Sequence, residues 1–577
     1  MGKYRNSVDG SELESDYEDD EGTEYRNQGL LGSGSFVRAR KFQSKDGRRS
    51  KAILDPYNKQ INDEVWGEVR SKYEFFKALY PEEEIELIQD EQTYRLVLPL
   101  FPGKTYKELG SVSNEEEQIN RFLSAIYALR DCHNKGYVVV DLKEDNILYD
   151  SESGKSYLID GGIATKEGKR LHPQFKAENE EYAKWIRRQR PFYAPECFGI
   201  EKSPKAVKTM DIYSLGSMMK RIFKNPTPEL LELINQCQAE NPNKRITLDE
   251  LEKRLLDILF KRTAQEDEVI VDKKDEFFIA LGKKGPHSFV MLGVVQNGVP
   301  TLLCNIGKQL LNQDIGIPEF ALGFVFGQVQ AELTQESLHL KGKISYSAYA
   351  ISYNQYNEFQ RLLSLSYREK DIACYQPDRE NADTVIMKNK VLPSMDLGQA
   401  SEEERTIAER SHYINVNNNC RHTGVDLVEY AQGIKHLTDN ISRLFFRNLP
   451  VSAHFSNGKP EQYFYVFPIP PASEALDPDK KAVLTKIYQR METLIEMAPY
   501  ADSTIQKFNA LKELYYKQAD IPDKDFAGAL DAICQWKKEY GNLIGQLRNP
   551  NIFKNFFITQ TSTQKMVNEI ETSLVNR

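Results

Sequence analysis

The stretch that decides the fold is VVVDLKEDNILYD, residues 138–150. Three valines, typical of a buried strand, lead into a charged turn, and the apolar text resumes after it. Asp141, Lys143 and Asn146 lie in this turn, and Asp160 follows the next apolar run in LIDGG. Two strands joined by a tight turn would gather these side chains at one edge. Carboxylate and amide oxygens are the ligands that Mg²⁺ prefers.

Upstream, LLGSGSFVRA contains two glycines that let the backbone approach a phosphate group closely. Gly32 and Gly34 are these glycines, and Phe36 could cover the phosphate. A plain hairpin turn has the same composition, so this motif alone does not decide the function.

The order of six motifs over residues 27–262 resembles the protein kinase superfamily. The resemblance implies an α+β, bilobal kinase-like fold that binds ATP and Mg²⁺. The motifs are GSGSFVRA (the glycine-rich loop), VVDLKEDN (the catalytic loop), DGG (in place of Asp-Phe-Gly), PFYAPE (Ala-Pro-Glu), DIYSLG (the helix that anchors the catalytic loop) and NPNKRIT, whose Arg245 is the usual partner of Glu196.

The family implies a role for each matching residue. Asp141 would accept the proton of the substrate hydroxyl, and Lys143 would place positive charge beside the transferring phosphoryl group. Asn146 and Asp160 would hold Mg²⁺. A lysine two places after the aspartate resembles Ser/Thr kinases rather than Tyr kinases.

The nucleotide-binding residues follow from the same resemblance. The segment from Pro99 to Phe101 would be the hinge that meets adenine. Lys51, in GRRSKAIL, is the best match to the nucleotide lysine, although a surface lysine is the alternative. We expect Glu68 to be its partner on the following helix, with Glu74 as the other candidate.

Three departures from the family pattern carry expectations. Val139 and Val140 replace His-Arg, so activity should not require phosphorylation of the activation loop. Gly161 replaces the phenylalanine of Asp-Phe-Gly, which should weaken the usual in/out switch. The interval from Asp211 to Arg245 is too short for the helix that ordinarily docks protein substrates. The compact domain is similar to secreted effector kinases of bacteria of the Legionella type.

The whole chain of 577 residues has enough hydrophobic content, 40%, to build several packed cores. Its net charge of −9 argues against general affinity for nucleic acid. The seven cysteines include no CxxC pair, which favours the reducing cytosol, and no apolar run is long enough for a transmembrane segment. The expected location is therefore cytosolic or, for a secreted effector, the host cell cytoplasm.

Four regions are expected along the chain. Residues 1–26 are rich in carboxylates and predict a disordered acidic tail. Residues 27–262 form the kinase-like domain, and residues 263–472 form an α/β domain of uncertain role. Residues 473–577 predict a helical C-terminal region.

The α/β domain carries a candidate second site. His287 begins an apolar strand, and Cys420 directly precedes an amphipathic helix, an order that resembles circularly permuted papain-like hydrolases. A third, orienting residue is not evident, and Asp426 is only a guess. The alternatives are a helix-capping loop before a buried cysteine and a binding or targeting module.

The sequence predicts a Ser/Thr protein kinase that transfers the γ-phosphate of ATP to protein substrates, with eukaryotic host proteins as the expected partners. The alternatives are a pseudokinase scaffold and a kinase-fold enzyme that transfers AMP. The possible Cys-His hydrolase of the second half is a separate hypothesis.

Overall fold

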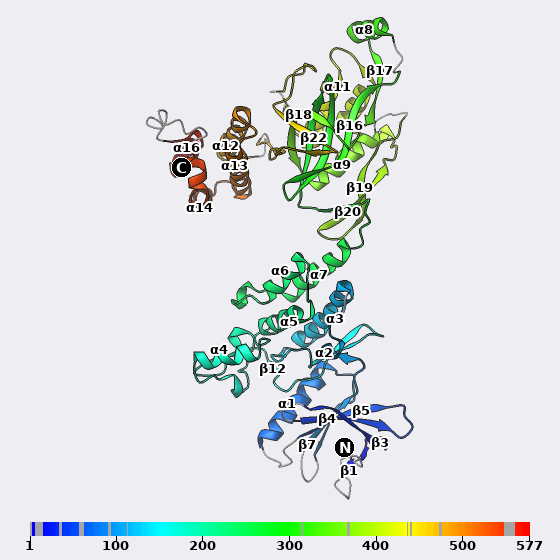
Figure 1. The fold of residues 1–577 in the computed structure, drawn as a ribbon, viewed down its shortest axis with the longest axis vertical. Helices are drawn as coiled ribbons and strands as arrows, with labels where there is room; N and C mark the ends of the chain where they lie inside the picture. The colour runs from blue at the N-terminus through cyan, green and yellow to red at the C-terminus, as the bar shows by residue number, and fades with distance from the viewer. Residues whose placement is uncertain are drawn as a thin grey trace. The chain divides into compact units, whose positions relative to one another are not determined.

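The chain divides into two compact units, Met1–Thr263 and Ala264–Arg577, each with its own core (Figure 1). None of the helices in the described residues combines the length and apolarity needed to cross a bilayer. The computed structural model describes residues 3–5, 16–33, 37–56, 63–89, 94–111, 114–312, 316–365, 370–435, 437–438, 441–471, 476–546 and 560–576.

The first unit begins with an antiparallel sheet whose order in the described residues is β1-β2-β3-β4-β5-β7-β6, and α1 packs against β7. Side chains of a strand alternate between the two faces of its sheet. On β5, Ile53 therefore lies on one face, while Ala52 and Leu54 lie on the other. The elements are β1 (Lys3–Arg5), β2 (Asp16–Glu18), β3 (Glu24–Ser33), β4 (Val37–Ser44), β5 (Ser50–Pro56), α1 (Asp63–Leu79), β6 (Glu86–Gln89) and β7 (Tyr94–Pro99).

The disordered tail predicted for residues 1–26 is wrong at Lys3–Arg5, which form β1 and pair with β2, and from Asp16 onward. β2 pairs with β3, and Tyr17 and Asp19 are buried. The Asp19 carboxylate accepts hydrogen bonds from the Thr23 backbone N–H (2.8 Å) and the Tyr25 hydroxyl (3.0 Å). The composition of the segment predicts a solvated tail, because composition gives no information on which hydrogen-bond donors a buried carboxylate will find in the fold.

The rest of the first unit is mainly helical around α3, which begins at Asn114, whose side chain accepts from the Glu116 N–H. Its buried residues recur at helical spacing. The elements are β8 (Lys104–Thr105), α2 (Tyr106–Leu109), α3 (Glu115–Asn134), β9 (Tyr137–Val138), β10 (Ile147–Asp150), β11 (Lys155–Leu158), β12 (Thr165–Lys166), η1 (Pro173–Phe175), α4 (Glu180–Gln189), η2 (Pro195–Cys197), α5 (Thr209–Ile222), α6 (Pro228–Cys237), η3 (Pro242–Lys244) and α7 (Leu248–Lys261).

The second unit is built on an antiparallel sheet whose order in the described residues is β21-β17-β16-β15-β14-β18-β22-β23, with α11 packed against β14, β15 and β16. The named strands described here pair antiparallel, so this unit is α+β rather than the expected α/β. Its elements up to residue 460 are β13 (Val269–Asp272), β14 (Glu276–Lys284), β15 (His287–Gln296), β16 (Val299–Leu310), α8 (Ile317–Phe326), β17 (Val329–Gln335), β18 (Gly342–Ile351), α9 (Tyr353–Leu365), β19 (Ala373–Glu380), β20 (Thr384–Val391), η4 (Leu397–Gln399), α10 (Glu402–Ser411), β21 (Tyr413–Ile414), α11 (Cys420–Gln432), β22 (Val451–Ser456) and β23 (Lys459–Pro460).

The C-terminal helices belong to the same unit as this sheet. The ring of Phe508 on α13 packs against Tyr465 at 4.9 Å, and Lys512 donates to the Val466 carbonyl at 2.7 Å. A boundary at 472 therefore does not separate two cores. The helices are α12 (Pro478–Met497), α13 (Asp502–Asp520), α14 (Phe526–Gly545) and α16 (Ser562–Val575).

Candidate functional site

One buried carboxylate, that of Asp211, binds the backbone at the start of the catalytic loop. Asp211, at the start of α5, accepts the backbone N–H groups of Val139 (2.8 Å) and Val140 (2.7 Å), and His133 Nε2 lies 2.9 Å from its Oδ2. Val140 has φ 67°, a left-handed conformation that a β-branched residue adopts only at a cost. The Asp211 bonds fix this strained turn, and Asp141 follows it directly.

Asp141, Lys143 and Asn146 form one hydrogen-bonded group. Lys143 Nζ donates to Asp141 Oδ2 at 2.6 Å, and Asn146 Nδ2 donates to the same oxygen at 3.1 Å. The Ile159 N–H donates to the Asn146 carbonyl at 3.0 Å, so the segment leading into Asp160 runs directly beside this loop. The sequence-predicted residues 141, 143, 146 and 160 thus come together at one edge of the β10–β11 hairpin.

A lysine from α1 reaches Asp160. Lys72 is buried, with 6% of its surface exposed, and its Nζ lies 3.7 Å from Asp160 Oδ1. The Gly162 N–H also donates to Asp160 Oδ1, at 2.9 Å. The Asp160 side chain remains 42% exposed, so its second oxygen can take another partner.

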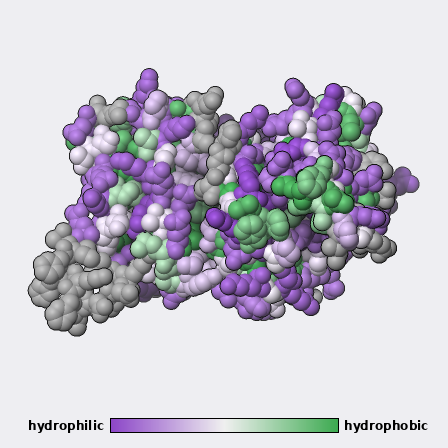
Figure 2. Space-filling view, turned by 90° about the horizontal axis from the view of Figure 1, so that it is seen from above, coloured by the Kyte–Doolittle hydropathy of each residue, from purple (hydrophilic) through white to green (hydrophobic). Residues whose placement is uncertain are grey.

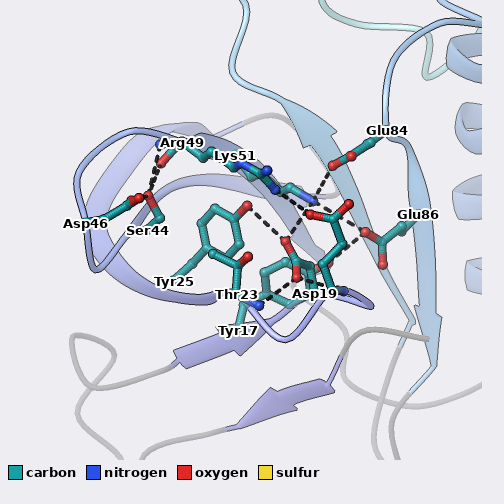
Figure 3. Close-up of polar contacts among 11 residues, drawn as sticks. Tyr17, Asp19, Thr23, Tyr25, Ser44, Asp46, Arg49, Lys51, Glu84 and Glu86 are labelled. Carbon is teal, nitrogen blue, oxygen red and sulfur yellow. Dashed lines mark hydrogen bonds and ion pairs between the residues drawn. The ribbon is translucent and has the colours of Figure 1, made fainter.

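Lys51 does not lie at this site, and its assignment as the nucleotide lysine is wrong. It shares the face of Ile53 on β5, where its Nζ lies 3.1 Å from Glu84 and 3.4 Å from Glu86 (Figure 3). The rings of Tyr17 and Tyr25 flank it at 5.6 and 5.4 Å. Lys51 therefore connects the N-terminal strands β2 and β3 to the face of the sheet that carries Ile53, opposite the main core.

Asp19, the buried carboxylate beside Lys51, is stabilised in its ionised form by this network. Burial opposes ionisation of Asp19, but hydrogen bonds from Thr23 and Tyr25 and the charge of Lys51 outweigh it and lower the pKa of Asp19. Burial and the neighbouring Asp19 raise the pKa of Tyr25 to about 12. Lys51 thus neutralises a buried carboxylate, which is a structural role.

The register of β5 shows which residue occupies the usual position of the lysine. Lys51-Ala52-Ile53-Leu54 aligns with the family motif V-A-I-K, so Leu54 stands where the lysine is expected. Leu54 and Ala52 lie on the face that packs with the main core of the unit. Lys72 therefore brings a positive charge to Asp160 from the helix instead of from β5.

Other predicted nucleotide residues are only partly described. Gly34, Phe36 and the side chain of Glu68 lie outside the described residues, and Gly32 is an exposed residue of β3. The alternative Glu74 is exposed and pairs with Arg70 at 3.1 Å, so it is not the partner of a cleft lysine. At the hinge, Pro99 ends β7.

Phe101 of the hinge joins an aromatic group. Its ring lies 4.6 Å from Tyr80 and 5.1 Å from Tyr157, on the strand that precedes Asp160. The Tyr80 hydroxyl accepts the Leu158 N–H at 2.9 Å. These contacts connect the hinge to the segment that carries Asp160.

A phenylalanine from α1 fills the space of the missing Asp-Phe-Gly aromatic. A β-carbon on Gly161 would lie 2.2 Å from the Phe75 ring, which itself packs edge-on against Tyr137 at 5.3 Å. Phe75 is fully buried. The aromatic contact is thus supplied by α1, and Gly161 is the residue that makes room for it.

Restoring the family residue, Gly161→Phe, is expected to destabilise the chain by about 1–3 kcal/mol, because two aromatic rings cannot share this space. Gly161→Phe combined with Phe75→Ala should cost less than the sum of the two single changes. Calorimetric unfolding of the four chains measures this coupling. Additive costs would show that the two positions do not compete.

A mostly buried ion pair joins Arg245 to Glu196 of the PFYAPE motif. Arg245 Nη2 lies 2.8 Å from Glu196 Oε2, Nη1 binds the other carboxylate oxygen, and the guanidinium stacks on Tyr213 at 5.0 Å. Between Asp211 and Arg245, the described elements are α5, α6 and η3. In the described residues, the short interval predicted from the sequence thus holds one α-helix, α6, and the short 3-10 helix η3 after α5.

In the second unit, the structure brings Cys420 beside His287, because the N–H of the next residue, Ser288, donates to Cys420 Sγ at 3.4 Å. The interaction between the two side chains raises the pKa of His287 and lowers that of Cys420. Asp426 is not the third member of this group, because it pairs with Arg410 at 2.8 Å. The residue that the sequence did not indicate is Glu336, whose Oε1 lies 3.0 Å from His287 Nε2.

Comparison with known proteins agrees with the geometry of the first unit. The family model described as "Protein kinase domain" matches residues 25–228. The chain is similar to serine/threonine-protein kinase ppk34 of Schizosaccharomyces pombe, with 25% identity over 35% of this chain and 64% of that protein. It is also similar to sperm motility kinase 2B of Mus musculus, with 32% identity over 27% of this chain and 31% of that protein.

A probable serine/threonine-protein kinase of Dictyostelium discoideum is 28% identical over 21% of this chain and 11% of that protein. The matched region thus spans between about a tenth and two thirds of these relatives. The residues matched by the family model include Asp141, Asn146 and Asp160. Residues 25–228 are a protein kinase domain of the eukaryotic-like Ser/Thr kinase superfamily.

Proposed function

We propose that the first unit is an active, ATP-dependent Ser/Thr protein kinase. The observation that carries this proposal is the single hydrogen-bonded group of Asp141, Lys143 and Asn146 next to Asp160. A structural scaffold would not need a base, a cation and two metal-ligand side chains at one edge. Phosphoryl transfer is mainly positioning and charge neutralisation, and this group supplies both.

In the proposed reaction, Asp141 accepts the proton of the substrate hydroxyl, whose oxygen bonds to the γ-phosphorus while the bond to the β-phosphate oxygen breaks. Lys143 neutralises charge on the transferring group. Burial of Tyr193, and then the negative charge of Asp141, raise the pKa of Tyr193, so its neutral hydroxyl borders the base.

The donors present fit Mg²⁺. The side-chain nitrogen of Asn146 donates hydrogen bonds to Asp141, which leaves the side-chain oxygen, Oδ1, as a possible metal ligand. The Asp160 side chain is partly exposed. Mg²⁺ bound by these oxygens would neutralise charge on the phosphates of ATP. In the same proposal, Lys72 takes the part of the nucleotide lysine, because it is a buried cation beside Asp160.

The test uses the full chain, MgATP and a protein mixture, followed by mapping of the modified residues. Label from γ-labelled ATP on serine or threonine, with none from α-labelled ATP, is the expected result. Label from α-labelled ATP would support the alternative, AMP transfer. A rise in melting temperature with MgATP but no transfer would support a pseudokinase that only binds nucleotide.

Action on eukaryotic host proteins after secretion by a bacterium stays a prediction. Its support is the compact segment between Asp211 and Arg245, which holds one α-helix and a short 3-10 helix after α5 in the part of the chain that the structure describes. Identification of proteins phosphorylated in a eukaryotic lysate tests it, and failure to phosphorylate any of them would count against it.

A further inference from the structure

The strongest unassigned group of reactive side chains lies in the second unit, around Cys420. This cysteine is the first residue of α11, and the Asn419 side chain caps the helix by accepting the Arg421 N–H at 2.9 Å. Cys420 Sγ accepts the Ser288 backbone N–H at 3.4 Å. A helix N-terminus and an N–H donor both favour the thiolate form of a cysteine.

His287, the first residue of β15, stands between Cys420 and a carboxylate. Its Nε2 lies 3.0 Å from Glu336 Oε1, and Gln309 Nε2 donates to the same oxygen at 3.0 Å. Because Nε2 faces Glu336, Nδ1 is the ring nitrogen that remains for the interaction with Cys420. The order of contacts is thiol, imidazole, carboxylate.

The strand between His287 and Glu336 is shaped for this contact. Gly307 on β16 lies between them, and a β-carbon there would come within 2.2 Å of Glu336 Oε1 and 2.8 Å of His287 Nε2. A larger residue would force the imidazole and carboxylate apart. The His287–Glu336 pair therefore depends on a glycine at this position.

The electrostatics of the group agree with its geometry. Burial lowers the pKa of His287, but hydrogen bonds with Cys420 and Glu336 outweigh it and raise the pKa to about 9. Burial raises the pKa of Cys420, but the bonds from His287 and Ser288 outweigh it, and the net pKa lies below the ordinary value. The other charged groups that face Cys420 are Lys308, whose pKa burial lowers to about 7, and Arg421.

We infer that Cys420, His287 and Glu336 form the catalytic triad of a cysteine hydrolase that cleaves peptide or isopeptide bonds of polypeptide substrates. Nucleophile, base and orienting carboxylate each lie within reach of the next, which is the arrangement that activates a thiol for acyl transfer. This activity is independent of the proposed kinase, because its residues all belong to the second unit.

The reaction has two steps. The Cys420 thiolate attacks the amide carbon and forms a C–S bond; His287 gives its proton to the leaving nitrogen as the C–N bond breaks. Water then loses a proton to His287 and attacks the thioester; the C–S bond breaks and the acid is released. The Cys420 N–H, at the first helical position, has no acceptor within its helix and is suited to the oxyanion.

The surroundings of the nucleophile favour a substrate with apolar side chains. The Val416 N–H, in the loop before Cys420, donates to the Phe324 carbonyl of α8 at 2.9 Å. On α8, Leu322, Val325 and Phe326 are exposed, Phe326 by 85%. In Figure 2, which looks onto the end where Figure 1 draws α8, a patch of apolar residues lies among mostly hydrophilic ones. A peptide with apolar residues beside its scissile bond would cover them.

The first test measures alkylation of the full chain by iodoacetamide at pH 6, cysteine by cysteine, with mass spectrometry. Cys420 should react severalfold faster than Cys534, because a lowered pKa raises the fraction of reactive thiolate at this pH. Cys534 is the matched control, since it is similarly exposed and lies near Glu571. His287→Ala should remove the difference, and Glu336→Gln should shift the alkylation profile to higher pH.

The second test measures turnover, with a library of peptide amides that carry a fluorogenic leaving group. The full chain should release the group and form a thioester on Cys420, and turnover should fall as the pH rises through about 9, where His287 loses its proton. Cys420→Ala should abolish release, and the control variant Cys534→Ala should leave it unchanged. Phe326→Asp should raise KM for apolar peptides without changing the alkylation rate.

Two results would overturn the inference. Alkylation of Cys420 no faster than that of Cys534 would show that the thiol is not activated. Rapid alkylation without any release that depends on Cys420 would show that the group binds electrophiles but does not hydrolyse amides.

Discussion

Asp141→Asn is expected to lower kcat for phosphoryl transfer by about 10²–10⁴-fold, the usual contribution of a positioned general base. Asparagine keeps the size of the side chain but cannot accept the substrate proton. It also removes the negative charge that holds Lys143 at 2.6 Å. Initial rates with γ-labelled ATP and a substrate from the lysate measure the effect.

The matched control is Asp145→Asn, in the same loop. Asp145 is exposed and pairs with Lys107 at 3.0 Å, so its replacement should leave kcat essentially unchanged. The melting-temperature shift with MgATP should persist in Asp141→Asn, because Asn146 and Asp160 remain. A loss of less than tenfold in Asp141→Asn would show that Asp141 is not the base.

The catalytic loop could be predicted from the sequence because its geometry is local. Asp141, Lys143 and Asn146 lie within six residues, and one tight hairpin brings Asp160 back beside them. Asp211, which binds the backbone of the catalytic loop, is distant in sequence, but it belongs to the recognisable motif DIYSLG. Short loops and motifs of this kind leave few alternative arrangements.

The lysine could not be predicted by residue type alone. In Lys51-Ala52-Ile53-Leu54, side chains alternate between faces, so an error of one residue in the alignment reverses every assignment. The sequence itself indicates this, because aligning Ala52 with the alanine of V-A-I-K puts Leu54, not Lys51, at the lysine position. Residue identity favoured Lys51, while the alternation of the strand contradicts it.

Glu336 and Phe75 escaped prediction for a different reason. Glu336 is 49 residues from His287, and the two meet only because β15, β16 and β17 are neighbours in the sheet. Phe75 meets Gly161 only because α1 packs beside the segment that carries Asp160. Neither contact leaves a local pattern, so only the assembled fold shows it.

Lys72→Met is expected to lower kcat/KM for ATP-dependent transfer by about 10²–10³-fold, comparable to loss of one preorganised charge at a reacting centre. Methionine fills most of the same volume, so the buried position tolerates it better than alanine. Without the cation, Asp160 loses the ion pair with Lys72, whose Nζ lies 3.7 Å from its Oδ1. Steady-state kinetics with varied ATP measure the change.

Lys51→Met separates this role from a general need for a buried lysine. Its ion pairs with Glu84 and Glu86 and its proximity to Asp19 predict a loss of about 1–3 kcal/mol in stability. On the back of the sheet it touches no residue of the Asp141 group, so kcat/KM of the folded protein should stay near the wild-type value. Calorimetric unfolding and kinetics of the same sample distinguish the two effects.

The double variant Leu54→Lys with Lys72→Met moves the cation to the position that the family motif uses. Leu54 faces the main core of the unit, the side on which α1 and Lys72 lie, so a lysine there can extend toward Asp160. Partial recovery of kcat/KM over Lys72→Met alone is the expected result. The opposite result would be loss of transfer in Lys51→Met with normal transfer in Lys72→Met. It would show that Lys51, and not Lys72, is the lysine that binds the nucleotide.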